Sequence, residues 1–283
     1  MRGRGGPVGG KQEDAMDNPR ASQRIVVGID GSEAAINAAK WAAAEAVSRN
    51  IPLRLIHAIP QRDGDDDSLD IEYAQESLRA ADAAVRATGE RVDVESDIVR
   101  GSSEAVLIDE SQNAAMVCLG SVGMGWVARK VLGSTADTVA HKAHCPVAII
   151  RSGRAAAHPD GGYVAVAVEE SPANDAVLEH GFREARLRGA SILAMGVWRW
   201  GLGEIPYSQL NHRLGPWASR HGEVHVQPVS ARRGAAEFLS RTLEPVQLAV
   251  VGTEDADKVA RMVGPVTTHS GGRPGCSVLV VRD

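Results

Sequence analysis

Short, almost continuously apolar runs recur along this chain, and longer alanine-rich segments separate them. In the first half we expect strands near residues 25–30, 53–58, 92–99, 115–119 and 146–151. We expect helices near residues 33–48, 70–88, 103–113 and 135–143. The runs at 25–29, 115–119 and 146–150 are typical of parallel strands that are covered on both faces. Alternating strands and helices therefore predict an α/β fold, a parallel sheet wound with right-handed crossovers.

The second half of the chain repeats the pattern of the first. Four matching pairs carry the repeat: residues 25–32 with 164–171, 45–46 with 184–185, 116–120 with 248–252, and 145–151 with 276–282. Two pairs share one offset in the sequence, Cys145 with Cys276 and Gly133 with Gly264. We therefore expect a tandem duplication in which the last third of each half is in register.

The repeat sets the expected domain boundaries. We predict a first domain at 24–151 and a second at 163–283, each of a common domain size. Residues 152–162 have the Gly, Ala, Pro and His composition of a linker. Residues 1–23 are expected to form a disordered tail, with Met16 as an alternative start of translation.

A glycine-containing loop follows the apolar run at 115–119. It reads Gly120-Ser-Val-Gly123, then nine residues, then Gly133-Ser134. Glycines at a strand end let the backbone turn tightly and approach a ligand without a Cβ in the way. Gly133, Ser134 and Thr135 are expected where the next helix begins, with unpaired N–H groups and the positive end of the helix dipole. This arrangement predicts a polyphosphate cradle, and we interpret the first half as an ATP-binding domain.

Asp30 ends the first predicted strand and is the candidate partner for the nucleoside. A carboxylate there can accept hydrogen bonds from ribose hydroxyls or from an adenine amine. Ligands of open α/β sheets bind at the carboxyl ends of strands, where the winding order reverses. If the first and fourth strands are neighbours, Asp30 and Gly120 flank one crevice. The alternative is that Asp30 only caps the following helix through a turn at Ser32.

Other phosphate and catalytic motifs are missing from the sequence. It contains no GxxxxGK[ST], which excludes a Walker-type NTPase. Its glycines after the fourth strand run in the order GxxGxG, so a dinucleotide fingerprint fails. Arg129 and Lys130 lie inside the nine-residue span, where they either add positive charge near the phosphates or are solvated. No Ser/His/Asp or Cys/His arrangement can be argued from the spacing.

Metal sites are not expected on the protein itself. His141 and His144 share a helix face, but no third ligand is apparent nearby. We expect Mg²⁺ only on the phosphates of a bound nucleotide.

Composition and charge narrow the function classes further. The net charge of −5 and the pI near 6.0 argue against nucleic-acid or membrane-surface binding, which needs a concentrated basic face. Cys118, Cys145 and Cys276 lie in or beside apolar runs and are expected to be buried free thiols in a reducing compartment. No stretch approaches the roughly 20 apolar residues that cross a bilayer, and no apolar segment follows the basic N-terminus. We therefore expect a cytoplasmic protein.

At this point the chain resembles a known family. Asp30, the glycine signature from Gly120 to Ser134 and the order of elements look like a universal stress protein. More closely, residues 24–283 resemble the tandem-domain universal stress proteins of actinobacteria, the mycobacterial group included. The resemblance implies two five-stranded parallel sheets, each in strand order 3-2-1-4-5, of the adenine nucleotide alpha-hydrolase-like type. It also implies ATP bound in the first domain.

The resemblance assigns residues to the ATP site by position. Gly28, Ile29 and Asp30 line the adenosine side, with Ala58 beside the adenine. The remaining contacts border the ribose and hold the phosphates: Leu119, Gly120, Val122, Gly123, Gly133, Ser134 and Thr135. The family also pairs its last strands edge to edge, which here implies that 146–151 joins 277–282 in a pseudo-twofold monomer without exposed edges. Further homodimerisation and an unknown protein partner stay open.

The second half departs from the signature. Asp255 stands where the second glycine belongs, the spacing to Gly264 is one residue short, and Pro265 replaces the serine. Glu169 replaces the aspartate of the first strand. These changes remove donors and add negative charge, so we predict an empty or repurposed second site. An aromatic cluster occurs only in this half, at Trp198, Trp200, Tyr207 and Trp217. We expect it to form packing contacts or a surface that binds a partner.

The function that these observations favour is regulatory ATP binding, and the resemblance adds a role in stress or dormancy. The alternatives are a slow ATPase or phosphotransferase, and an interaction scaffold without nucleotide. Catalysis of phosphoryl transfer depends chiefly on positioning the reactants and neutralising their charge. A phosphate cradle with Mg²⁺ can therefore support some turnover of ATP. We expect at most weak ATP hydrolysis, because the sequence shows no catalytic base.

Overall fold

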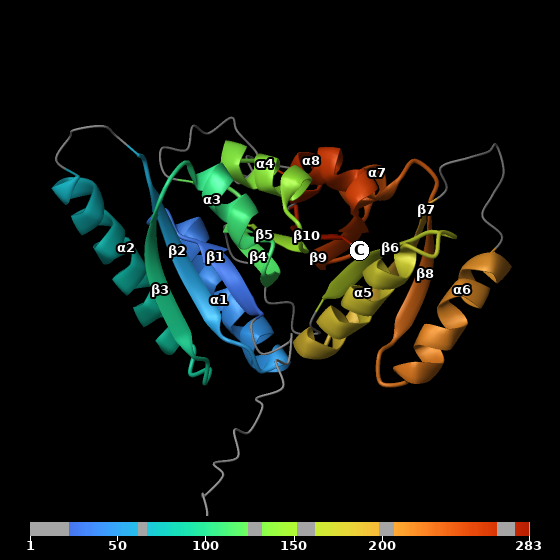
Figure 1. Cartoon of the computed structure of the whole chain (residues 1–283). Coiled ribbons are helices and arrows are strands. Elements are labelled where there is room, and N and C mark those ends of the chain that lie inside the picture. Colours follow the sequence, from blue (N-terminus) through green and yellow to red (C-terminus); the bar gives the residue numbers. More distant parts are fainter. Residues whose placement is uncertain are drawn as a thin grey trace, which may run out of the picture.

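The computed structural model describes residues 23–61, 67–123, 132–151, 162–197, 207–264 and 275–282 (Figure 1). The first half contains β1 (Arg24–Gly28), α1 (Glu33–Arg49), β2 (Leu53–Ile59), α2 (Ser68–Arg86), β3 (Val94–Arg100), α3 (Ser103–Glu110), β4 (Ala114–Gly120), α4 (Ser134–Lys142) and β5 (Val147–Ile150). The second half contains β6 (Tyr163–Val168), α5 (Asn174–Arg188), β7 (Ser191–Val197), α6 (Tyr207–Arg220), β8 (Val226–Ala231), α7 (Ala235–Arg241), β9 (Val246–Gly252), the 3₁₀ helix η1 (Thr253–Lys258), α8 (Val259–Val263) and β10 (Ser277–Val281).

Local capping explains where the first-half helices begin. Ser32 precedes α1 in an extended conformation, and its side chain accepts a hydrogen bond from the backbone N–H of Ala35. Ser102 caps α3 in the same way through the N–H of Ala105. Asn50 ends α1 in the left-handed region, which asparagine tolerates better than most residues. Short polar side chains thus fix the helix boundaries within a few residues of those expected.

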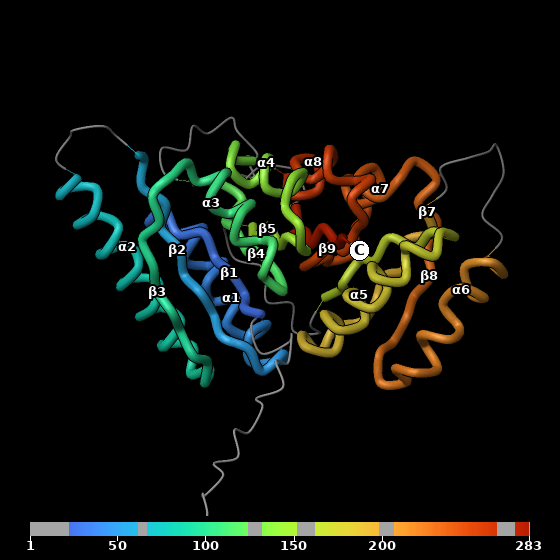
Figure 2. The backbone as a smooth tube through the Cα atoms, viewed as in Figure 1, coloured from blue at the N-terminus to red at the C-terminus, as the bar shows by residue number. Residues whose placement is uncertain are grey.

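The strands form one sheet in the order β3-β2-β1-β4-β5-β10-β9-β6-β7-β8 (Figure 2). Each half has the predicted strand order when its own strands are numbered one to five, and neighbours within each half are parallel. The halves meet where β5 and β10 pair antiparallel, with Ile149 opposite Val278 and Val147 opposite Val280. The fold class is confirmed, and so is the pairing of the last strands, which joins the two five-stranded units into one ten-stranded sheet.

Helices cover both faces of this sheet. Along β1, Ile25 and Val27 face a core made with α1, α2, α5 and α6, whereas Val26 faces the core made with α3, α4, α7 and α8. Alternating side-chain direction along a strand explains this division. The first core includes a row of fully buried alanines on α1, which lets that helix lie close to the strands. Both faces are therefore covered, as the continuously apolar strands predict.

The end of the second half differs from the expected register. Gly133 precedes α4, but Gly264 follows α8 and ends it with a positive φ of 66°. The two glycines therefore do not occupy equivalent places, although Cys145 and Cys276 both precede the last strand of their half. The reason is that η1 begins directly after β9 and brings the helical segment forward. The prediction from the equal sequence offset, that Gly133 and Gly264 are equivalent, is therefore wrong.

Several predictions concern residues outside the described ranges: the tail at 1–22, Arg129, Lys130, the linker at 152–161, Trp198, Trp200 and Pro265.

The three cysteines are free and buried, as expected. Burial raises the pKa of Cys145 and of Cys276 to about 12, and that of Cys118 well above its usual range. Within the described part of the chain, no helix combines the length and apolar character that crossing a membrane requires.

Candidate functional site

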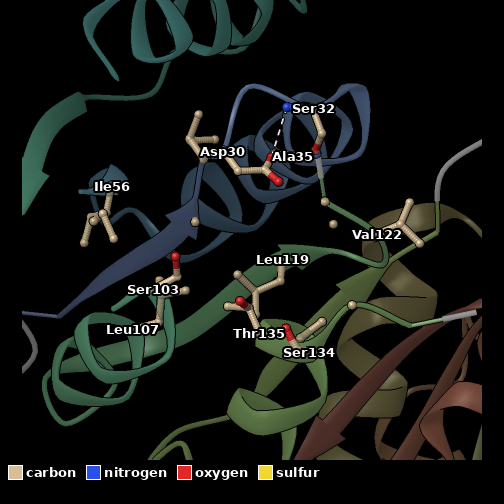
Figure 3. Close-up of a pocket in the computed structure, with 17 residues that line it drawn as sticks. Asp30, Ser32, Ala35, Ile56, Ser103, Leu107, Leu119, Val122, Ser134 and Thr135 are labelled. Carbon is tan, nitrogen blue, oxygen red and sulfur yellow. Dashed lines mark hydrogen bonds between the residues drawn. The ribbon is translucent and has the colours of Figure 1, made fainter. Parts of the chain in front are cut away.

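A cavity of about 470 Å³ lies at the carboxyl ends of β1 and β4, the point where the strand order reverses. All eleven residues predicted for the nucleotide site line it: Gly28, Ile29, Asp30, Ala58, Leu119, Gly120, Val122, Gly123, Gly133, Ser134 and Thr135. In Figure 3, Asp30 lies above Leu119, and Ser134 and Thr135 lie below it. The structure brings these residues together, while their contacts with a ligand stay a prediction.

Six further residues line the cavity and were not predicted: Ser32, Ala35, Ile56, Ser103, Leu107 and Ala136. Ile56 and Leu107 add apolar surface beside Ala58, suited to the face of a planar base. Ser103 is the first residue of α3, so a second helix N-terminus opens onto the cavity. The serines around 102 signalled this helix start in the sequence, but which cavity it meets depends on how α3 packs on the sheet.

Two glycines in the loop after β4 are required by close packing. A Cβ on Gly120 would lie 2.7 Å from the backbone carbonyl carbon of Ala34, in the first turn of α1. A Cβ on Gly123 would lie 2.6 Å from a carboxylate oxygen of Asp30. The contact at Gly120 is with backbone, so that position excludes a larger residue, whereas a Cβ on Gly123 would push the Asp30 carboxylate away from the loop. The glycine signature thus keeps the cavity mouth open and lets Asp30 lie against the loop.

Asp30 makes the turn contact that the sequence offered as one alternative, and it also lines the cavity. One carboxylate oxygen accepts a hydrogen bond of 3.0 Å from the backbone N–H of Ser32, which forms the turn before α1 (Figure 3). The same side chain lines the cavity. The hydroxyl of Tyr73, on α2, donates to the backbone carbonyl of Asp30 at 2.9 Å. Asp30 is therefore held by contacts on both sides while its carboxylate stays beside the cavity.

The start of α4 provides the positive end of the cavity. Gly133 is its N-cap with extended φ and ψ, and a glycine has no side chain that could cap the helix. Its first N–H groups are therefore open to a ligand. The Thr135 hydroxyl donates to Glu104 Oε1 at 3.1 Å and so turns toward α3 in this structure. Sequence reasoning missed Glu104 because the contact depends on the packing of α3 against α4.

Several known proteins resemble this chain in sequence. A family model described as the Universal stress protein family matches residues 21–151. A universal stress protein of Mycobacterium tuberculosis strain H37Rv is 46% identical over 260 residues, covering 91% of this chain and 96% of that relative. The chain belongs to the universal stress protein family. A second universal stress protein of that strain is 37% identical over 279 residues, covering 94% and 98%.

Solved structures support the fold of this universal stress protein. A universal stress protein from Archaeoglobus fulgidus DSM 4304 aligns with a TM-score of 0.67 and 18% identity, covering 94% of this chain and 98% of that one. The alignment spans both halves, so the tandem arrangement is shared along nearly the whole chain. At this identity the likeness concerns the fold alone.

The second half of this universal stress protein has only a cavity of about 40 Å³ at the corresponding strand ends. Asn174 lies in it, with its amide oxygen accepting from the N–H of Glu169 and its amide nitrogen donating to the carbonyl of Ala167. Arg213 donates to the carbonyl of Glu169 and pairs with Asp175. Protein groups therefore occupy the hydrogen-bonding positions that a ligand needs.

The charges at this second place are also unfavourable for an anion. Glu169 and Glu254 line the small cavity. Asp255 is buried and pairs with Lys258 at 2.8 Å. A phosphate there would meet the carboxylates of Glu169 and Glu254. Elsewhere, no group of three or more His, Cys, Asp or Glu residues suited to a metal ion occurs within the described ranges.

Proposed function

We propose that the first half of this universal stress protein binds ATP in the 470 Å³ cavity and that the second half binds none. The observation that carries the proposal is the junction of an uncapped helix N-terminus with a cavity that also contains Asp30. Backbone N–H groups and the helix dipole attract phosphates there. Asp30 lies at the end of β1 and is suited to bind the ribose hydroxyls.

The lining of the cavity supports an orientation for the nucleotide. Ile56, Ala58 and Leu107 provide apolar surface for the adenine. Ser134 and Thr135, at the start of α4, lie where the phosphates would be held. Glu104 bonds Thr135 and sets the direction of that hydroxyl, so the phosphates are held by backbone N–H groups and Ser134. Mg²⁺ on the phosphates would offset their charge.

A regulatory role suits the cavity better than catalysis. Of the described residues that line it, Asp30 alone carries an ionisable side chain. Its position at the end of β1 assigns it to the nucleoside and not to the reacting phosphate. Family membership supports a role in stress or dormancy. The buried free thiols support a reducing, cytoplasmic location.

The test is equilibrium binding of ATP to the full-length protein and to Ser134→Glu. Ser134 is exposed and is the first residue of α4, where a glutamate is compatible with the helix. Its carboxylate would face the phosphates, so we expect ATP affinity to fall at least about tenfold. Ser68→Glu is the matched control, because Ser68 is the exposed first residue of α2 and does not line the cavity.

The outcomes separate the competing functions. Wild-type protein that binds no ATP, or equal loss in both variants, contradicts the proposal. ATP that is recovered intact after prolonged incubation with excess protein supports binding without turnover. Stoichiometric conversion to ADP in a single-turnover experiment would instead assign an ATPase.

A further inference from the structure

A second large cavity, of about 680 Å³, lies between the C-terminal ends of α1 and α5. Its polar lining consists of Gln23, Ser48, Arg49, Arg183 and Arg186. It lies at the far end of α1 from the nucleotide cavity, because Ser32 and Ala35 line one cavity and Ser48 and Arg49 the other. A helix of 17 residues separates the two by about 25 Å.

We propose that this cavity is a second ligand site, which binds the phosphate group of a small molecule. Three arginines and no carboxylate are among the described residues that line it. Guanidinium groups present paired N–H donors that match the oxygens of a phosphate. The side chains of Ile51, Ala115 and Leu187 add apolar surface for the carbon skeleton of a phosphate ester.

The side chain of Arg49 has a buried N–H donor, Nε, with no acceptor among the described residues. Its side chain is 11% exposed, and one terminal nitrogen lies 3.3 Å from a carboxylate oxygen of Glu45. Its Nε is buried and has no hydrogen-bond partner among the described residues. Buried donors in native proteins are nearly always satisfied, by protein, water or ligand. Because this nitrogen has almost no accessible surface, a phosphate in the cavity that Arg49 lines would accept from it once the side chain had turned.

Arg183 and Arg186 can turn toward a ligand at little cost. Arg183 lies 3.9 Å from Glu179, and Arg186 lies 2.9 Å from Glu223. Both arginines are about half exposed, and exposed ion pairs of this kind contribute little to stability. Both arginines can therefore turn from these carboxylates toward a phosphate with little loss of stability.

Two buried carboxylates lie beneath the cavity and are paired with arginines. Glu45 and Glu184 are fully buried, and Arg188 bonds both of them, at 2.9 and 2.8 Å. Arg49, Arg183 and Arg186 are the cations that face the cavity. Burial first, and then the charges of Arg49 and Arg183, lower the pKa of His180 to about 3.

The experiment measures phosphate binding in a protein whose nucleotide cavity is blocked. In the Ser134→Glu background and without divalent metal, calorimetric titration with inorganic pyrophosphate should still show one binding site. Adding Arg183→Gln and Arg186→Gln should weaken this binding at least about tenfold. Adding Arg79→Gln and Arg86→Gln is the matched control, because these arginines are exposed, form similar helical ion pairs and lie on α2.

Loss of all pyrophosphate binding on blocking the nucleotide cavity overturns the proposal, and so does an equal effect of the two double variants. Melting temperatures close to that of the background protein exclude misfolding as the cause. Glucose 6-phosphate that binds more tightly than inorganic phosphate assigns the site to phosphate esters; equal affinity assigns it to the phosphate group alone. Failure of ATP binding in the wild type would leave these results unaffected, since the two cavities are tested separately.

Discussion

The two halves of this universal stress protein share one strand order, yet their cavities at the equivalent strand ends measure about 470 and 40 Å³. In the first half, α4 begins fourteen residues after Gly120. In the second, η1 starts directly after Gly252 and brings Asp255 into the protein interior. The reversal of strand order thus provides a place for a site, and the segment after the fourth strand decides whether a cavity forms there.

The helices α1 and α5 differ far less, and they join the halves. Glu45 and Glu184 occupy matching positions, and each has an arginine four residues later that pairs with it. Arg188 also crosses to Glu45 and stacks over the ring of Trp41 at 4.3 Å. The matching Glu–Arg pairs on α1 and α5 therefore keep the similarity between the halves that the two cavities have lost.

Removal of Arg188 should have the largest effect on stability. Arg188→Met leaves Glu45 and Glu184 buried together without their shared cation, and breaking a buried pair costs about 3–5 kcal/mol. Arg186→Met, on the same helix turn but exposed, should cost less than about 1 kcal/mol. Urea unfolding measures both; equal losses would show that the buried cluster does not hold the halves together.

Glycines at equivalent strand ends should respond differently to the same substitution. A Cβ on Gly120 meets the backbone of Ala34 at 2.7 Å, which cannot move without shifting α1, whereas one on Gly252 meets the flexible end of Glu254 at 2.5 Å. We expect Gly120→Ala to cost about 1–3 kcal/mol and Gly252→Ala less than about 1 kcal/mol. Chemical denaturation checks the difference, and the reverse order would contradict the packing argument.

Much of the fold follows from the sequence because its signals are local. Apolar runs mark the strands, and Ser32 and Ser102 mark helix starts through their own backbone neighbours. Eleven of the cavity residues were also expected, because Asp30 and the glycine loop pointed to this strand end and the family resemblance assigned the other residues by position. The bond from Thr135 to Glu104 was not, because it spans 31 residues and depends on helix packing. Nor was the change in place of Gly264, because equal spacing does not require equal conformation.

The pH dependence of stability should distinguish α5 from α1. Burial, and then the charge of Glu45, raise the pKa of Glu184 to about 7. The folded state thus holds a proton that the unfolded state releases near pH 4.5, so this contribution to stability is complete below that pH and is lost as the pH rises to about 7. The depressed pKa of His180 acts in the opposite direction below pH 6.5.

The difference between wild type and Glu184→Gln isolates the carboxyl group from that opposing effect. A glutamine cannot ionise, so the variant should lose the fall in stability between pH 5 and 7, on the order of 1–2 kcal/mol. Urea unfolding at several pH values measures this difference. A constant difference across the range would mean that Glu184 is already ionised in the folded protein at pH 5.

The smallest expected effect concerns the turn that holds Asp30. Tyr73→Phe removes the hydroxyl that donates to the Asp30 carbonyl, and a hydrogen bond of this kind contributes about 0.5–1.5 kcal/mol. Because the turn also orients the carboxylate beside the cavity, we expect ATP affinity to fall a few-fold. Tyr207→Phe, at the start of α6 in the second half, is the control and should leave ATP binding unchanged. Equal affinities in both variants would mean that the Ser32 contact alone fixes Asp30, and that Tyr73 serves the packing of α2.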